Sequence, residues 1–351
     1  MKRRVTLGIV ISIIFIYLAF RKVDYHEMVA ALKSAEYIWL LPALIFLFAS
    51  LLLRAIRWRY FVQPIKQIKL HPLFSAMMIG YAANNVFPLR LGEFLRAYAL
   101  GKSEGISKSS AFATVIVERL LDVLSLLAIL ALTILFYYRQ ANIKNNEEII
   151  FIQNSGYIIF ALTVSIIVLM VFLMEKTEST IRVFQFFLPT KIFIIVEKII
   201  RSFLQGFTVF KKSEHFLSIF ILSISLWIIY AGILYVSFIA FNFNTKYDLN
   251  VLASLVVLVT VSIGIMIPSS PAYVGTYHYF CMKSLSLFNV PASEALSFAI
   301  ISHFLSNIPL TLVGLIYFWK ENLHFSDVVV EKGIIEHEIK KEEKISGKVG
   351  S

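Results

Sequence analysis

Six ionised side chains are expected at membrane depth in this chain, within largely apolar sequence between Pro88 and residue 122. In chain order they are Arg90, Glu93, Arg96, Glu118, Arg119 and Asp122. One ionised side chain near the centre of a bilayer costs about 2.5 to 3.5 kcal/mol even on the gentlest scale, so six unpaired ones would cost roughly 15 to 20 kcal/mol. Three are arginines and three are carboxylates, so a fold that buries them together lets them neutralise one another.

The composition places the chain in a membrane. It is 58% hydrophobic and 16% charged, which excludes a soluble domain and a disordered chain. A bilayer-spanning helix needs roughly 17 to 25 apolar residues. Segments close to that length are 5–20, 37–53, 109–136, 149–174, 216–240 and 291–318. We therefore predict an all-α, polytopic helical membrane protein with about six full spans.

Lysine and arginine gather in alternate connecting segments. Residues 54–69 and 175–215, on one predicted side, hold five and seven of them, whereas the loops on the other side hold between one and three each. The positive-inside rule then places both termini in the cytoplasm, and we expect a multi-pass protein of the plasma membrane. Trp39, Trp58 and Trp319 fall at predicted span ends, where interfacial tryptophans are common.

Two further apolar stretches are interrupted and fit none of these spans. Hairpin A, residues 73–100, is broken at Pro88, and hairpin B, residues 251–288, is broken at Pro268. Each predicts a half-helix, a break and a second half-helix. Because broken backbone survives at membrane depth only against protein or a wet cavity, we expect both hairpins to be re-entrant and buried.

The two hairpins are related in sequence. The run Pro88-Leu-Arg-Leu-Gly92 matches Pro271-Ala-Tyr-Val-Gly275 at an offset of 183 residues. Under the predicted topology hairpin A enters from the cytoplasm and hairpin B from outside, so the copies form an inverted repeat. Interrupted helices in an inverted repeat are typical of secondary transporters. The alternative is a chance match between two proline-broken apolar segments.

The charged residues predict a site. Glu118, Arg119 and Asp122 are spaced three and four apart, which puts them on one side of a helix, and we expect the charged residues of hairpin A to face them. In one interpretation this is a substrate cradle in which arginine forks bind phosphate. In the other it is an internal ion-pair network that fixes the hairpin against the span.

Neutral or weakly basic side chains occupy the matching positions of the second copy. They are Ser269, Ser270, Tyr273, Tyr277, His278, Ser302, His303, Ser306 and Asn307. We include Ser269, Ser270, Tyr273, His278 and His303 with the six charged residues in the predicted substrate-binding set. The two histidines are either satisfied core groups or a proton-transfer pair.

Partners and cofactors follow from the remaining features. No nucleotide, metal or serine-nucleophile motif occurs, so we expect no cofactor and no metal. The net charge of +11 is explained by topology rather than by a nucleic-acid partner. We expect a membrane lipid as substrate. Residues 179–212 form either a basic amphipathic helix on anionic lipid head groups of the cytoplasmic face or a solvated connector, and residues 321–351 form a polar, disordered cytoplasmic tail.

Three motifs give the chain a likeness to a known family. They are Pro88-Leu-Arg-Leu-Gly-Glu-Phe-Leu-Arg96, Thr114-Val-Ile-Val-Glu-Arg-Leu-Leu-Asp122 and Pro268-Ser-Ser-Pro-Ala-Tyr-Val-Gly275. Over residues 1–320 the chain resembles the lysylphosphatidylglycerol synthase transmembrane domain, also called flippase-like. That resemblance implies movement of aminoacylated phosphatidylglycerol between leaflets, here by a stand-alone domain without the soluble synthase of longer members. The family usually has glycine in place of Ala272 and often glutamate in place of His278.

Two functional hypotheses result. The first is a flippase-like transporter of a phospholipid or polyprenyl-type lipid, whose head group passes between the hairpins beside Arg90, Arg96 and Arg119. The second is an intramembrane enzyme or partner subunit for lipid modification, with His278 and His303 as acid and base. The lack of a catalytic motif favours the transporter, and a structural scaffold is a third possibility.

Overall fold

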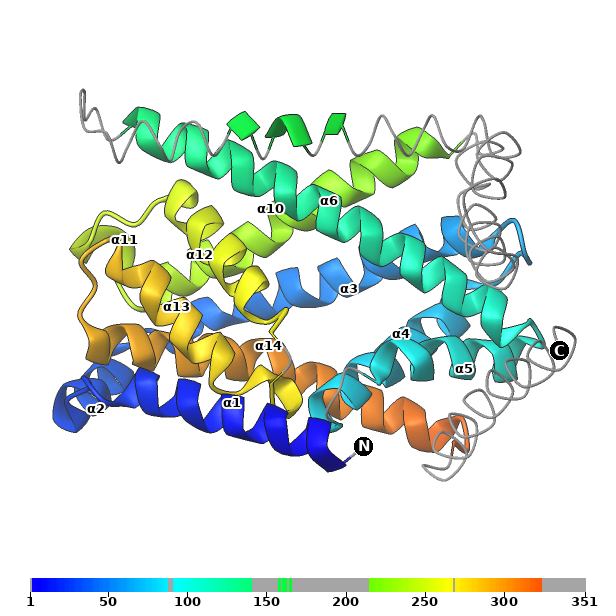
Figure 1. The fold of residues 1–351 in the computed structure, drawn as a ribbon, viewed down its shortest axis with the longest axis horizontal. Helices are drawn as coiled ribbons and strands as arrows, with labels where there is room; N and C mark the ends of the chain where they lie inside the picture. The colour runs from blue at the N-terminus through cyan, green and yellow to red at the C-terminus, as the bar shows by residue number, and fades with distance from the viewer. Residues whose placement is uncertain are drawn as a thin grey trace, which may run out of the picture.

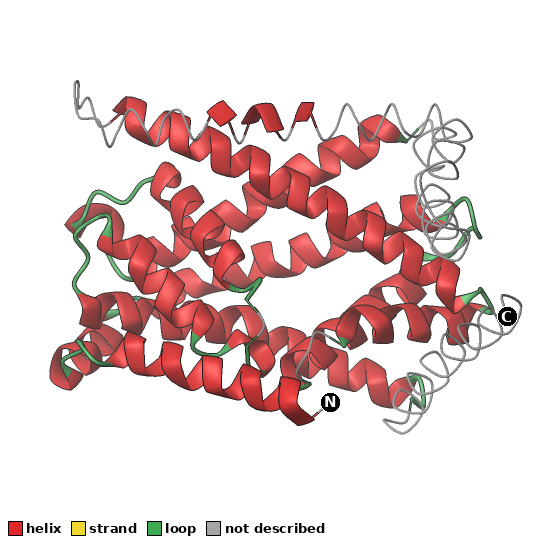
Figure 2. Cartoon of the chain, viewed as in Figure 1, coloured by secondary structure: helices red, strands yellow, loops and turns green. Residues whose placement is uncertain are grey.

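The computed structural model describes residues 2–87, 91–140, 157–158, 160–162, 164–165, 215–267 and 269–323. Over these residues the secondary structure is helical and contains no strand (Figure 2). The elements, shown in Figure 1, are α1 (Lys2–Phe20), α2 (Tyr25–Ser34), η1 (Tyr37–Trp39), α3 (Leu40–Val62), α4 (Leu70–Val86), α5 (Gly92–Glu104), α6 (Lys108–Gln140), α10 (Phe216–Ala240), α11 (Phe243–Lys246), α12 (Val251–Gly264), η3 (Pro271–Tyr273), α13 (Thr276–Ser286) and α14 (Ala292–Lys320).

Long apolar helices confirm the predicted fold class. Within the described residues, α3 with η1, α6, α10 and α14 are each long and apolar enough to cross a membrane. Helices α1 and α2 meet that criterion only as a pair bent by 85°. The part of the chain that the structure describes therefore holds four crossing helices, or five if the bent pair is one span. The predicted span at 149–174 lies mostly outside the described residues.

The outer surfaces of these helices are apolar, as lipid requires. On α10 the side chains of Leu217, Ile221 and Ile228 are all exposed, and the helix is apolar on every face. A helix of that kind is unstable at a protein–water boundary but suited to a bilayer. The chain is thus a multi-pass membrane protein.

Both predicted breaks are present. Helices α4 and α5 flank a break at 87–91, and α12 and α13 flank a longer one at 265–275 that contains η3. Figure 1 shows the α4–α5 pair at the right end of the bundle and the α12–α13 pair at the left end, each with its break toward the middle. The hairpins thus enter from opposite ends.

Helix packing follows the sequence repeat. Helix α4 packs on α14 and α12 packs on α6, while α5 packs on α6 and α13 on α14. Helices α3 and α10, which precede the two hairpins, pack on each other. This set of contacts is unchanged when each helix is exchanged for its counterpart in the other half of the repeat. The counterparts are α3 and α10, α4 and α12, α5 and α13, and α6 and α14. That symmetry favours a genuine inverted repeat over a chance alignment.

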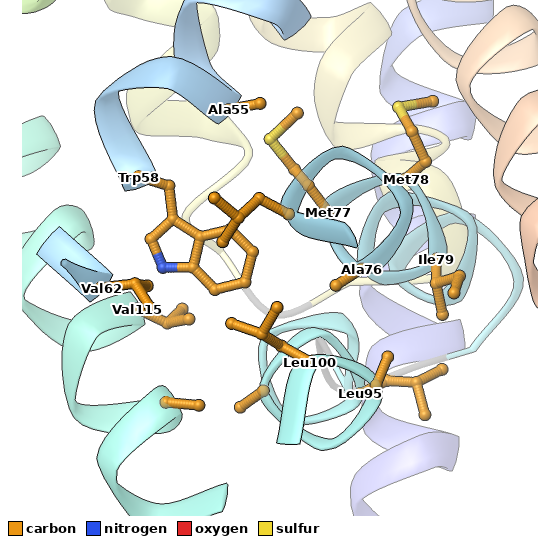
Figure 3. Packing of buried hydrophobic residues seen from close by; sticks show 14 of the residues in the cluster. Ala55, Trp58, Val62, Ala76, Met77, Met78, Ile79, Leu95, Leu100 and Val115 are labelled. Atoms are coloured by element: carbon orange, nitrogen blue, oxygen red, sulfur yellow. The ribbon is translucent and has the colours of Figure 1, made fainter. Parts of the chain in front are cut away.

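The α4–α5 hairpin is held by direct backbone contact. A Cβ atom placed on Gly80 would lie 2.8 Å from the Gly92 carbonyl oxygen, and the Gly92 N–H donates to Asn84 Oδ1 over 2.7 Å. Only glycine permits helices to approach this closely. Figure 3 shows Met77 and Leu100, from the two helices of this hairpin, packed against Trp58 of α3.

The structure corrects one sequence-based boundary. Helix α3 continues to Val62, so Arg54 and Arg57 are buried helical residues rather than members of the predicted cytoplasmic segment 54–69. Trp58 is also fully buried and is not an interfacial residue, because Arg96 and the hairpin A core cover it. Trp39 and Trp319 are exposed, as predicted. The predictions for Arg90, residues 179–212 and the tail beyond residue 323 lie outside the described residues.

Candidate functional site

Glu118 of α6 is the centre of a buried cluster of charged residues. Its side chain has 0% exposure. Its Oε1 accepts from Arg54 Nε over 2.8 Å and from Arg57 Nη2 over 3.3 Å, while its Oε2 accepts from Arg96 Nη2 over 2.8 Å. One carboxylate thus joins two arginines of α3 to one of α5, and both of its oxygens are used.

Asp122, one turn further along α6, repeats this arrangement. Its Oδ1 accepts from Arg57 Nη2 over 2.6 Å, and its Oδ2 forms an ion pair with Arg54 Nη2. Arg119 is held more loosely, because its guanidinium lies 3.5 Å from Asp122 Oδ2 and 3.5 Å from Glu93 Oε1 of hairpin A. We call these seven residues the arginine–carboxylate cluster: Arg54, Arg57, Glu93, Arg96, Glu118, Arg119 and Asp122.

Neutral partners complete the inner side of the cluster. On α10, the Tyr230 hydroxyl accepts a hydrogen bond from Arg54 Nη1 over 3.2 Å, and the Ser223 hydroxyl accepts one from Arg57 Nη1 over 3.1 Å. The Arg96 guanidinium lies 3.6 Å from the centroid of the Trp58 ring, whose Nε1–H donates to Thr114 Oγ1 over 2.9 Å. Apolar side chains surround that indole (Figure 3). The cluster therefore joins α3, α5, α6 and α10 in a low-dielectric setting, where ion pairs are strong.

Exposure divides the cluster into two layers. Arg57, Arg96 and Glu118 are buried, whereas the side chain of Arg119 is 35% exposed and those of Glu93 and Asp122 about half as much. Glu118 is ten residues beyond the start of α6, which is roughly 15 Å along that apolar helix. A partly exposed guanidinium thus lies well inside the span, next to hairpin A.

The structure brings together five of the six predicted charged residues, and the placement of Arg90 lies outside the described part of the chain. Sequence reasoning missed Arg54 and Arg57. A signal was available: the two arginines are three residues apart and are followed by Trp58 to Val62, which continue the helix without a breaker. Extending the span through them would have put both on one helical face.

Hairpin B is built from neutral groups. The Ser269 and Thr276 hydroxyls lie 3.1 Å apart, and the Ser270 N–H donates to Ser12 Oγ of α1 over 2.8 Å. Ala272 adopts φ +52°, a left-handed conformation that glycine tolerates better than alanine. Tyr273 follows at φ +59°, so the break makes a tight left-handed turn.

His278 and His303 lie side by side, with ring centroids 4.8 Å apart, and both are buried. The Gly275 N–H donates to His278 Nδ1 over 3.4 Å. His303 Nε2 lies 2.7 Å from the Ala272 carbonyl oxygen, and because a carbonyl only accepts, this nitrogen carries the proton. Tyr277 donates to Ser302 Oγ over 3.0 Å beside them. Both imidazoles thus bind the backbone of the break.

Among the described residues no group of three or more histidine, cysteine or acidic side chains is arranged to hold a metal ion. What the geometry offers is charge and hydrogen bonding. The hairpin A half presents guanidinium groups and the hairpin B half presents hydroxyls and imidazoles. The first suits an anionic group, and the second suits neutral polar groups.

Relatives of this chain are membrane proteins and one glycosyltransferase. A UPF0104 membrane protein of Methanocaldococcus jannaschii is 28% identical over 324 residues, which are 89% of this chain and 93% of that protein. Another, from Methanothermobacter thermautotrophicus, is 29% identical over 174 residues, 49% of this chain and 48% of the relative. Glycosyltransferase AglD of Haloferax volcanii is 31% identical over 127 residues, 35% of this chain but only 20% of that protein.

A family match covers nearly all of the helices described above, from α1 to α14. Residues 5–314 match the family described as lysylphosphatidylglycerol synthase TM region. The match includes both hairpins and the arginine–carboxylate cluster. The chain therefore belongs to the lysylphosphatidylglycerol synthase TM region family.

Proposed function

We propose that this protein is a flippase-like transporter that moves a phospholipid or related lipid between leaflets, with the head group passing beside Arg96 and Arg119. The observation that carries the proposal is the partly exposed Arg119 guanidinium, which lies at membrane depth between the break of hairpin A and a buried ion network. Charged residues within membrane spans are costly and commonly mark a substrate pathway.

The arrangement of the hairpins supports the same function. Two broken helices enter from opposite ends, and their ends leave backbone groups available near the middle of the bundle. A lipid head group that crosses the bilayer needs polar groups at that depth, while its acyl chains remain in the surrounding lipid. The apolar outer surface of α10 and its neighbours suits the second requirement.

The comparisons support a lipid-related role at the membrane. One relative is named as a glycosyltransferase, and the family is named for a lipid synthase. We place the α4–α5 end of the bundle at the cytoplasmic face of the plasma membrane, with both termini inside, on the basis of the charge asymmetry.

Reconstitution in liposomes tests the transporter proposal. A fluorescent phospholipid is distributed over both leaflets, and a membrane-impermeant reductant bleaches only the outer one. Wild-type protein should allow nearly complete bleaching within minutes, and Arg119→Ala should return it to the half-bleached value of empty liposomes. Arg59→Ala is the matched control. It also removes one positive charge, but from a residue of α3 that stacks on Tyr60 and is not part of the cluster. Normal flipping by a stably inserted Arg119→Ala protein would remove the cluster from the mechanism.

The alternative function is an intramembrane enzyme or partner subunit for lipid modification. The contact between His278 and His303 favours it, because two adjacent imidazoles can transfer a proton. Lipid extracts of cells that express the chain distinguish the two. A new lipid species that disappears with His303→Ala favours an enzyme, whereas a changed leaflet distribution of existing lipids favours a transporter.

A further inference from the structure

The described part of the arginine–carboxylate cluster is not neutral. It contains four arginines and three carboxylates, a surplus of one positive charge. Five of the six carboxylate oxygens are already occupied. Both oxygens of Glu118 and both oxygens of Asp122 accept from or pair with arginines, and Glu93 pairs with Arg119. The surplus therefore lies on guanidinium groups.

Several guanidinium donors have no protein acceptor within the described residues. They are Arg57 Nε, Arg96 Nε, Arg96 Nη1 and Arg119 Nε, all buried atoms. Arg96 is 3% exposed and stacked on Trp58, so its donors contribute mainly a positive field. Within the described chain Arg119 forms only ion pairs of 3.5 Å, without a hydrogen bond at its Nε, and its side chain is the most exposed of the four, so it is the arginine that a ligand would contact.

Phosphate matches this set of donors. A phosphate diester carries one negative charge and oxygens that only accept, and a guanidinium binds two such oxygens through parallel N–H groups. One bound phosphate would cancel the surplus charge. It would also give Arg119 the acceptor that Glu93 and Asp122 supply only at 3.5 Å.

A cationic head group fits poorly. Glu93 Oε2 is a buried acceptor without a hydrogen-bond partner in the described chain, so it is the one atom that an ammonium could use. An ammonium there would lie beside Arg119 in a cluster that is already positive. Like charges this close together repel strongly in a low-dielectric site. A second positive charge is therefore disfavoured.

We propose that the cluster selects a lipid head group with net negative charge whose phosphate contacts Arg119, and that it discriminates against a head group to which a cationic aminoacyl group has been added. This inference rests on the proposed function, since it names the cargo of the same site. It goes against the cationic aminoacylated cargo that the family resemblance implies.

Binding to purified protein in detergent tests the selectivity independently of transport. The probes are phosphatidylglycerol, its lysyl ester and a phosphate-free monogalactosyl diacylglycerol with the same acyl chains, together with soluble glycerol 3-phosphate. We expect phosphatidylglycerol to bind at least tenfold more tightly than the other three. Arg119→Gln should reduce its affinity to that of the galactolipid, Arg119→Lys should retain part of it, and the control Arg59→Gln should retain all of it.

Other outcomes separate the two proposals. Equal binding of all three lipids, or tighter binding of the lysyl ester, would overturn the selectivity and leave transport intact. Equal binding of glycerol 3-phosphate would overturn the lipid as ligand. Tight, Arg119-dependent phosphatidylglycerol binding by a protein that moves no lipid in liposomes would support the site while refuting the transporter. Gel filtration of each variant verifies that it is folded.

Discussion

Glu118→Gln is the most informative single substitution in this protein. It keeps the size of the side chain and removes the charge that Arg54, Arg57 and Arg96 share over 2.8, 3.3 and 2.8 Å. The new amide can still accept from one guanidinium, but its NH₂ group faces another donor. The described cluster changes from four arginines and three carboxylates to four and two, and its surplus charge rises from one to two.

The expected cost is large because Glu118 is fully buried. Removing one partner of a buried ion pair costs about 3 to 5 kcal/mol, since the other charge remains without compensation. Glu93→Gln is the matched control. It removes the same charge from a partly exposed residue whose ion-pair contact is 3.5 Å long, which should cost about 1 kcal/mol or less. The two variants should therefore differ by at least about 2 kcal/mol.

Cys281 provides the assay. It is the only cysteine of the chain and is fully buried, so a thiol-reactive dye labels it only when the bundle unfolds. One kcal/mol shifts the midpoint by about 2 to 4 °C in chains of 150 to 250 residues, and somewhat less in longer chains. At one fixed heating rate we expect Glu118→Gln to unfold at least about 3 °C below Glu93→Gln.

A double variant makes the reasoning refutable. Arg96→Leu added to Glu118→Gln removes one of the uncompensated cations and restores the surplus of one positive charge. Because the cost comes from unpaired buried charge, the double variant should be more stable than the sum of the two single effects. The reasoning fails if Glu118→Gln unfolds within 1 °C of Glu93→Gln, or if the effects of the two substitutions simply add.

Three further predictions concern the hairpins. Gly92→Ala should prevent folding, because its Cβ would overlap the Gly80 carbonyl, and gel filtration should then show aggregated protein. The control Gly232→Ala should be tolerated, because its Cβ would lie 3.5 Å from the Phe46 ring. A monodisperse Gly92→Ala protein contradicts this prediction. Ala272→Gly should raise the unfolding midpoint by 1 to 2 °C, because the left-handed conformation of an alanine costs about 1 kcal/mol and glycine removes that cost. The control Ala97→Gly, inside α5, should lower the midpoint. A lower midpoint for Ala272→Gly counts against strain at this residue. Amide hydrogen exchange should be faster at Gly275, whose N–H donates over 3.4 Å, than at Gly92, whose N–H donates over 2.7 Å. Equal protection of the two amides refutes the difference.

Local chemistry explains what the sequence predicted correctly. Proline and glycine weaken helices, and their close spacing at Pro88 to Gly92 and at Pro268 to Gly275 made the breaks of both hairpins visible without knowledge of the fold. Helical spacing alone places Glu118 and Asp122 on one face. By contrast, Arg54 and Arg57, which pair with them, are 61 to 68 residues away in sequence, and that pairing is a property of tertiary packing.

Arg54 and Arg57 were missed for a specific physical reason. A basic residue at the end of an apolar run serves either as a topological signal in a loop or as a buried partner of a carboxylate, and the run itself does not distinguish these roles. The distinction depends on the acidic residues, since two carboxylates at membrane depth require cations.

The two halves of the repeat share a backbone plan but differ in what holds their breaks. The hairpin A half is tied to α3 and α6 through ion pairs in a low-dielectric environment, where separating one pair costs several kcal/mol. Hairpin B is held by neutral hydrogen bonds, which the Ser270 N–H, the Gly275 N–H and His303 donate and which are each worth about 1 kcal/mol net. A motion that opens a path between the halves therefore costs less on the hairpin B side. If the protein moves lipid as proposed, we expect hairpin A to be the fixed, charged half beside the head group and hairpin B to be the half that moves.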